Sequence, residues 1–278
     1  MRGPRESFNE NLRTNTSLLR RRVKNSRLTF ESMVVGRKTN TNLCITYIDG
    51  LADPKLIAEI KRRIGYINVD MILESGYIEE YIEDRPFSIF ATMGLTERPD
   101  VLAGKLLEGR VGILIDGSPF ALTAPYFFIE AFQNPEDYYA RSTYASIVRI
   151  FRYLAFFLSI LVPGLYVALT SYHQELIPAS LLFSMSASSE GVPFNSFTET
   201  ALFLLIFELL KEAGIHMPKN VGQTISIVGG LVMGEAAIQA GIIGAPVVII
   251  IAFTAVSSFV VPMLSNAVSY THLTLPTT

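Results

Sequence analysis

One charged side chain near the end of the chain has the type and the setting to do chemistry. Glu235 is the only Asp, Glu, Lys or Arg among the last 59 residues, from Asn220 to Thr278. A helix turns by about 100° per residue, so Glu235 shares a face with Thr224, Val228, Leu231 and Gln239. The opposite face consists almost entirely of small residues, which allow close helix packing. They are Gly222, Ser226, Gly230, Gly234, Ala237 and Gly241.

Placing the Glu235 carboxylate inside a membrane costs free energy, so the sequence predicts that this helix needs partners. An acid at the middle of a membrane raises the free energy of helix insertion by roughly 2.5–3.5 kcal/mol, and each Ile, Val or Leu lowers it by roughly 0.3–0.6 kcal/mol. Eight such residues lie between Ile225 and Ile243 and about cancel one Glu. Two interpretations stay open. Either Glu235 faces water in a pore or cavity, or it is buried and hydrogen-bonded to a neighbouring helix. Acids within membrane spans usually mark ion or proton paths.

The other reactive residue types show no spacing typical of an active site. Cys44 is the only cysteine, so neither an intrachain disulfide nor a cysteine metal site is predicted. The chain has no glycine-rich phosphate loop following a strand and no nucleophile motif. Three histidines are scattered without ligand spacing: His173, His216 and His272. We therefore predict no enzyme activity, no cofactor and no metal.

The N-terminal region carries a basic cluster. Residues 1–27 contain eight basic and two acidic residues. The densest group is Arg20, Arg21, Arg22 and Lys24. One interpretation is a solvated helix face, and the other is contact with anionic lipid head groups, which attract such clusters by roughly 1 kcal/mol per charge. A nucleic-acid partner is not predicted, because charge in the rest of the first half is balanced.

Charge divides the chain into two parts. Residues 1–152 hold 21 Lys and Arg and 19 Asp and Glu, whereas residues 153–278 hold 2 and 6. This distribution excludes a wholly soluble globule, a disordered chain and a protein with a broad basic face. We expect a soluble domain over residues 1–140 and a membrane domain over 141–266. Basic residues before the first apolar stretch, and a polar start without a signal peptide, predict that the soluble domain is cytosolic.

The soluble part has strands interleaved with short helices. Alternating patterns predict strands at 28–36, 43–50 and 110–115. Capping residues and apolar spacing predict helices at 54–65, 74–84 and 96–107. This order indicates an α/β or α+β fold.

The membrane part is expected to be all-α and to cross the bilayer several times. Apolar stretches of about 20 residues span a hydrocarbon core of about 30 Å. We predict spans near 147–172, 194–212, 221–243 and 245–265. The shorter apolar stretch 176–188 predicts an interfacial or re-entrant helix.

Stretches along nearly the whole chain resemble the A subunit of spore germinant receptors, the GerA family of endospore-forming Firmicutes. As a set they are specific, although each is weak alone. They include Arg2-Gly3-Pro4-Arg5-Glu6, Glu74-Ser75-Gly76-Tyr77-Ile78-Glu79-Glu80, Thr96-Glu97-Arg98-Pro99-Asp100, Pro135-Glu136-Asp137-Tyr138-Tyr139, Tyr172-His173-Gln174-Glu175-Leu176-Ile177-Pro178 and Gly222-Gln223-Thr224-Ile225.

The resemblance implies a multi-pass subunit of a nutrient receptor in the spore inner membrane. It would act with a transporter-like B subunit that binds the nutrient and a C subunit that is a lipoprotein. The A subunit would form a homo-oligomeric ring with a central cation path. The alternatives are a secondary transporter subunit, with Glu235 as a proton relay, and a non-conducting scaffold for a ligand-binding partner.

Three departures from the family pattern lead to further expectations. Glu235 stands where family members often carry Gln. The N-terminal domain starts part-way through the family's domain, so an upstream subdomain is expected to be missing. Residues 267–278 do not match the family's continuation and are expected to be a non-native tail.

Overall fold

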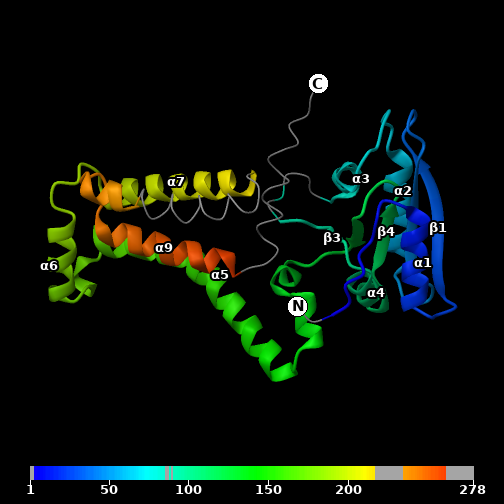
Figure 1. Cartoon of the computed structure of the whole chain (residues 1–278), viewed down its shortest axis with the longest axis horizontal. Coiled ribbons are helices and arrows are strands. Elements are labelled where there is room, and N and C mark those ends of the chain that lie inside the picture. The colour runs from blue at the N-terminus through cyan, green and yellow to red at the C-terminus, as the bar shows by residue number, and fades with distance from the viewer. Residues whose placement is uncertain (1–2, 85–87, 89, 217–233, 261–278) are drawn as a thin grey trace. The chain divides into compact units, whose positions relative to one another are not determined.

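The computed structural model describes residues 3–84, 88, 90–216 and 234–260 (Figure 1). The chain divides into two compact units, whose described parts lie within residues 1–145 and 146–260. Each unit is described by itself.

The first unit is built on a five-stranded sheet in the order β1-β2-β4-β5-β3. All four strand pairings are antiparallel. The strands are β1 (Leu28–Val35), β2 (Thr41–Ile48), β3 (Gly94–Thr96), β4 (Val111–Ile115) and β5 (Ala121–Ala124). The predicted mixture of strands and helices is confirmed. The sequence left the α/β and α+β classes open, and the antiparallel pairing identifies this unit as α+β.

Helices cover both faces of this sheet (Figure 1). They are α1 (Leu12–Arg22), α2 (Pro54–Tyr66), α3 (Ser75–Ile82) and α4 (Pro99–Leu107). Helices α2 and α3 pack on one face, and α1 and α4 pack on the other. Because successive side chains of a strand point to opposite faces, Leu43 and Ile45 of β2 enter the core under α2 and α3, whereas Cys44 enters the core under α1 and α4.

A segment of short helical turns connects the sheet to the second unit. It contains the 3-10 helices η1 (Phe128–Phe132) and η2 (Pro135–Tyr139), and α5 (Ser142–Ser171) begins three residues later. The sequence Asn134-Pro135 supplies the local signal for η2, because Asn134 accepts a hydrogen bond from the backbone N–H of Glu136 and Pro135 occupies the first turn.

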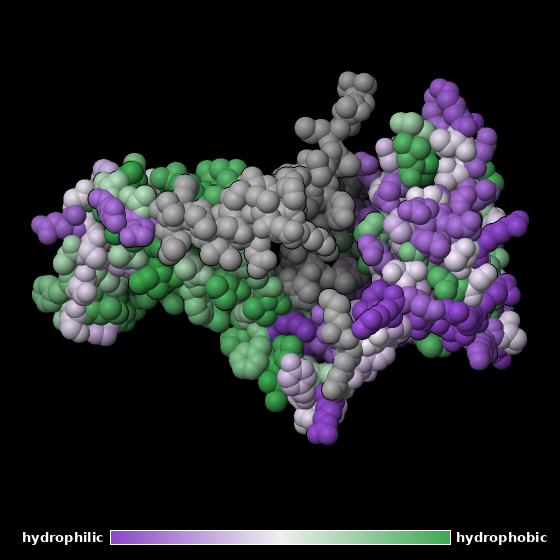
Figure 2. All heavy atoms as spheres, in the orientation of Figure 1, coloured by the Kyte–Doolittle hydropathy of each residue, from purple (hydrophilic) through white to green (hydrophobic). Residues whose placement is uncertain are grey.

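The described part of the second unit is helical. It contains α5, η3 (Gln174–Leu176), α6 (Ala179–Ser188), α7 (Ser196–His216), a helical stretch at 234–239, and α9 (Ala245–Phe259). Tyr166, Phe203, Val247 and Ile251 form its buried core. Figure 2 shows hydrophobic residues over the surface of α5 and α9.

Among the described residues, α5 is the helix that is both long and apolar enough to cross a membrane. Helices α6 and α9 are apolar but shorter, and α7 carries Glu199, Glu208, Lys211 and Glu212. The expected span at 194–212 corresponds to a helix that continues to His216. The expected span at 245–265 is helical as far as Phe259, and residues 261–265 lie outside the described part, as does the expected tail at 267–278.

Candidate functional site

The predicted polar face lies partly within the described residues. Glu235 and Gln239 are both exposed, and the Gln239 side-chain amide donates a hydrogen bond of 3.3 Å to the Glu235 carboxylate. The two side chains therefore share one face of the helical stretch, as the spacing of four residues predicts. Thr224, Val228 and Leu231 lie outside the described residues.

The predicted small face is described at three of its six positions. Gly234 is buried, and a Cβ atom placed there would lie 3.3 Å from Cγ1 of Val248 and 3.9 Å from Cζ of Phe203. Ala237 packs against the core of the second unit. This side of the stretch therefore contacts α7 and α9. Gly222, Ser226 and Gly230 lie outside the described residues.

Gly241 is a correction to the predicted face. The helix that was expected to reach Ile243 ends four residues earlier, and Gly241 adopts a left-handed φ of 64°. Its N–H bonds to the carbonyl of Ile238, and the N–H of Ile242 bonds to the carbonyl of Ala237. This is the hydrogen-bond pattern of a glycine that closes a helix, so Gly241 ends the helix and contributes no packing surface there.

Glu199 is a second carboxylate of the second unit, and it contacts the start of α9. Glu199 of α7 is 3% exposed and accepts a hydrogen bond of 3.1 Å from the backbone N–H of Gly244. Gly244 is the N-cap of α9, where backbone N–H groups lack partners within the helix. Glu199 therefore fixes the start of α9 to α7, in contrast to the exposed Glu235.

The basic cluster lies at the end of α1. Glu6 forms ion pairs with Arg21 and with Arg22, the latter at 2.9 Å. The guanidinium of Arg20 lies 4.7 Å from the centre of the Phe30 ring, and Lys24 is exposed. The basic residues Arg20, Arg21 and Arg22 lie on a helix, as the interpretation of a solvated helix face predicts. Two of them, Arg21 and Arg22, are paired with Glu6 of the same chain.

The first unit also contains a site that the sequence did not indicate. A pocket of about 260 Å³ lies between α4, β3 and the segment 126–139. Besides Asp100, its lining on α4 includes Val101, Gly104 and Lys105, and the C-cap residue Glu108 follows. Positions three or four residues apart share one side of a helix. The other side of α4 carries Leu102 and Leu106, which pack on the sheet. The amphipathic pattern of α4 thus turns Lys105 into the pocket.

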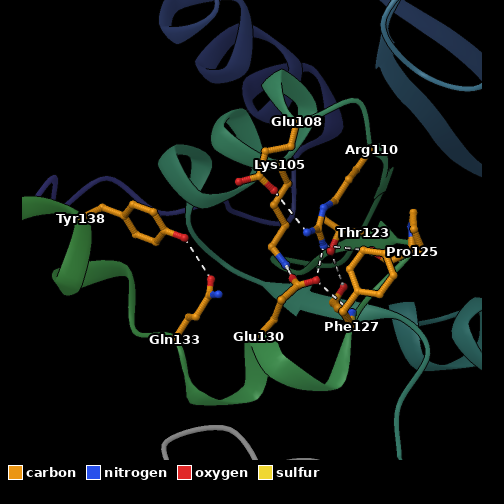
Figure 3. Close-up of polar contacts among 10 residues, drawn as sticks. Lys105, Glu108, Arg110, Thr123, Pro125, Phe127, Glu130, Gln133 and Tyr138 are labelled. Atoms are coloured by element: carbon orange, nitrogen blue, oxygen red, sulfur yellow. Dashed lines mark hydrogen bonds and ion pairs between the residues drawn. The ribbon is translucent and has the colours of Figure 1, made fainter. Parts of the chain in front are cut away.

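Lys105 and Arg110 meet on one carboxylate, that of Glu130 (Figure 3). Lys105 contacts Oε2, and Arg110 contacts Oε1. The side chain of Glu130 is 7% exposed, and it also accepts a hydrogen bond of 2.9 Å from the N–H of Phe127. Gly109, with a φ of 86°, makes the turn that places Arg110 close after α4. The triad joins α4, the residue that precedes β4, and η1.

The charges of the triad are set by burial and by mutual contact. Burial raises the pKa of Glu130, but the hydrogen bonds from Lys105 and Arg110 outweigh it and leave that pKa below its usual value. Burial lowers the pKa of Lys105, partly offset by Glu130. Burial and the charge of Glu130 raise the pKa of Tyr126 to about 12, so its hydroxyl stays protonated at neutral pH.

A second ionic group closes another side of the pocket. Arg98 donates to Asp100 through Nε at 3.1 Å and through Nη2 at 2.8 Å. The Tyr139 hydroxyl donates to the same carboxylate at 2.6 Å. Tyr138 donates to Gln133 at 2.9 Å (Figure 3). The bond from Tyr139 to Asp100 holds η2 against the beginning of α4.

Sequence reasoning missed this site for a physical reason. Lys105 and Glu130 are 25 residues apart, and neither lies in a motif. The partial signal was Lys105 itself, since a cation within the apolar run of α4 has to reach either solvent or a counter-ion. Among the described residues no group of three or more His, Cys, Asp and Glu is arranged to hold a metal.

The described part of the chain combines a folded N-terminal unit with a helical unit in which one helix, α5, is long and apolar enough to cross a membrane. The model of the GerA family, Bacillus/Clostridium GerA spore germination protein, matches residues 1–277. The chain belongs to the GerA family.

Individual relatives agree with this family. Spore germination protein KA of Bacillus subtilis (strain 168) is 50% identical over 268 residues, which cover 96% of this chain and 49% of that protein. Uncharacterized membrane protein YfkQ of the same organism is 47% identical over 276 residues, covering 99% of this chain and 54% of that protein. The chain thus spans about half the length of the curated relatives it matches.

A solved structure is also similar. It is the crystal structure of the N-terminal domain of the A subunit of the Bacillus megaterium spore germinant receptor GerK3. The sequence identity is 48%, and the match covers 44% of this chain and 98% of that chain, with a TM-score of 0.37.

Proposed function

We propose that the chain is a non-enzymatic A subunit of a nutrient-sensing germinant receptor and contributes to a ligand-gated cation path. Membership of the GerA family supports the role in germination. The observation that carries the conduction proposal is the exposed pair of Glu235 and Gln239, on a helical stretch whose buried side contacts Val248 and Phe203. An exposed carboxylate in a largely apolar unit needs water or a polar partner.

In this proposal the second unit crosses the spore inner membrane several times and the first unit lies in the cytosol. Copies of the subunit assemble around the face that begins at Thr224 and continues through Val228, Leu231, Glu235 and Gln239. Gly222, Ser226, Gly230, Gly234 and Ala237 pack behind it. A nutrient-binding B subunit and a lipoprotein C subunit complete the receptor.

The test is the cation current of the receptor complex in liposomes. Replacing Glu235 with Gln removes one negative charge per subunit from the path, so we expect lower cation conductance and weaker preference for cations over anions. Glu190→Gln is the matched control, because Glu190 is an exposed carboxylate of the same unit outside this stretch. Unchanged current and selectivity in the Glu235 variant would remove Glu235 from the path.

The same recordings separate the alternatives. A proton current coupled to a solute, abolished by Glu235→Gln, would indicate the transporter subunit. A complex that assembles and binds nutrient without any current would indicate the scaffold.

A further inference from the structure

We propose that the pocket between α4 and the segment 126–139 binds a small organic anion, a carboxylate with an apolar body. The proposal concerns the first unit alone and does not depend on ion conduction by the second.

The acidic groups around the pocket already have partners. Both oxygens of Glu130 are bonded to cations, and both oxygens of Asp100 are bonded to Arg98, one of them also to Tyr139. Glu108 reaches Arg110 at 3.2 Å. A cationic ligand would compete with Lys105, Arg98 or Arg110 for these carboxylates, so the lining is less suited to one.

Donor capacity remains on Lys105. Its ammonium has three N–H donors. The structure gives it one acceptor among the described residues, Glu130, and the ring of Tyr126 with its centre 5.0 Å away. The side chain is 17% exposed, so little solvent reaches it. A ligand carboxylate could accept the remaining hydrogen bonds, and such charge-assisted bonds are about twice as strong as neutral ones.

The rest of the lining suits an apolar body of modest size. Leu95, Val101 and the rings of Tyr126, Tyr138 and Tyr139 contribute apolar surface. The volume of about 260 Å³ lies just below the range of roughly 300–1,000 Å³ for sites that hold drug-sized ligands. The pocket therefore fits the apolar body of a compact acid.

Bound anion would join two parts of the first unit. One wall belongs to α4, and the opposite wall belongs to η1 and η2, of which η2 ends three residues before α5 begins. A ligand that contacts both walls stabilises the docking of this segment on α4, since it binds only when the walls are together.

Fluorine NMR of the full-length chain in nanodiscs tests this directly. The probes are 4-fluorobenzoate and 6,6,6-trifluorohexanoate, and 4-fluorobenzamide is the neutral isostere of the first. We expect at least one acid to bind with a dissociation constant of about 1 mM or tighter. We expect the amide to bind at least about tenfold more weakly, because it lacks the charge that Lys105 recognises.

Two variants locate the site. Gly104 lines the pocket, and a Cβ atom placed on it would have no neighbour within 4 Å, so Gly104→Leu should place an apolar side chain in the pocket. Lys105→Met removes the ammonium and keeps the stem. The controls are Gly65→Leu, at an equally open helical glycine on α2, and Lys55→Met, at an exposed lysine.

We expect both pocket variants to weaken binding of the acid at least about tenfold, and both controls to leave it unchanged. If Lys105→Met fails to fold, the Gly104→Leu result decides. Absence of binding of both acids at about 10 mM, equal binding of the amide, or full binding to Gly104→Leu would each overturn the proposal.

Discussion

The Glu130 carboxylate accepts hydrogen bonds from Lys105, Arg110 and the backbone N–H of Phe127. It neutralises Lys105 and Arg110 in a region where the side chains are at most 17% exposed. Removing one member of a buried ion pair leaves a charge that is neither hydrated nor compensated. Its neighbour Glu108 also reaches Arg110, but that carboxylate is 55% exposed, and exposed pairs contribute little.

We therefore expect Glu130→Gln to lower the free energy of unfolding of the first unit by about 3–5 kcal/mol. The matched Glu108→Gln should lower it by about 0–1 kcal/mol. Urea unfolding of the full-length chain, followed by hydrogen exchange at β4, measures both. Equal losses in the two variants would mean that burial of Glu130 has no energetic consequence.

The same contact has a defined pH dependence. The folded pKa of Glu130 lies below its unfolded value, so its contribution is fully present above the unfolded pKa of about 4.3. It is lost as the pH falls through the folded pKa, because protonation removes the charge. The difference in stability between the wild type and Glu130→Gln should shrink correspondingly at low pH.

At the scale of elements, the packing of α4 on the sheet depends on a glycine of β4. A Cβ atom at Gly112 would lie 2.7 Å from Cδ1 of Leu102 and 3.0 Å from Cγ2 of Thr46. Gly104, on the pocket side of the same helix, has open space. The two glycines therefore respond oppositely to the same substitution.

We expect Gly112→Ala to destabilise the first unit by about 1–3 kcal/mol, because the core is overpacked. Gly104→Ala should instead stabilise α4 by up to about 1 kcal/mol, because alanine is the better helix former. Amide exchange rates of β4 in the full-length chain report both changes. A neutral Gly112→Ala would show that α4 can move away from the sheet without cost.

These elements also show what the sequence can predict. The strands β1, β2 and β4 and the helices α2, α3 and α4 follow from alternation, capping and apolar spacing, and are confirmed. The strands β3 and β5 have three and four residues, too few for a pattern to emerge. The Lys105–Glu130–Arg110 triad was missed because its members meet only after β4, β5 and η1 are in place, and no local spacing encodes that contact.

At the scale of the whole molecule, charge is concentrated in the first unit and apolar surface in the second. The basic cluster on α1 is the part of the first unit that a lipid surface would attract most. Glu6 forms ion pairs with Arg21 and Arg22, and Arg20 and Lys24 are the exposed cations of the cluster that Glu6 does not pair.

We expect amides of α1 to exchange more slowly in phosphatidylglycerol liposomes than in phosphatidylcholine liposomes. Each cation contributes about 1 kcal/mol to such an attraction, so the double variant Arg20→Glu and Lys24→Glu should abolish the difference. Lys55→Glu serves as the control, at an exposed lysine of α2. Identical exchange in the two lipids would leave α1 with a purely structural role.

Strand β2 sends alternate side chains into both cores of the first unit. The layers on the two sides of the sheet therefore cannot come apart independently, since displacing this inner strand opens both interiors to water. Loosening of α1 and α4 on one side and of α2 and α3 on the other would be a single cooperative event. The first unit of this GerA-family chain is therefore expected to open as one cooperative unit when β2 is displaced.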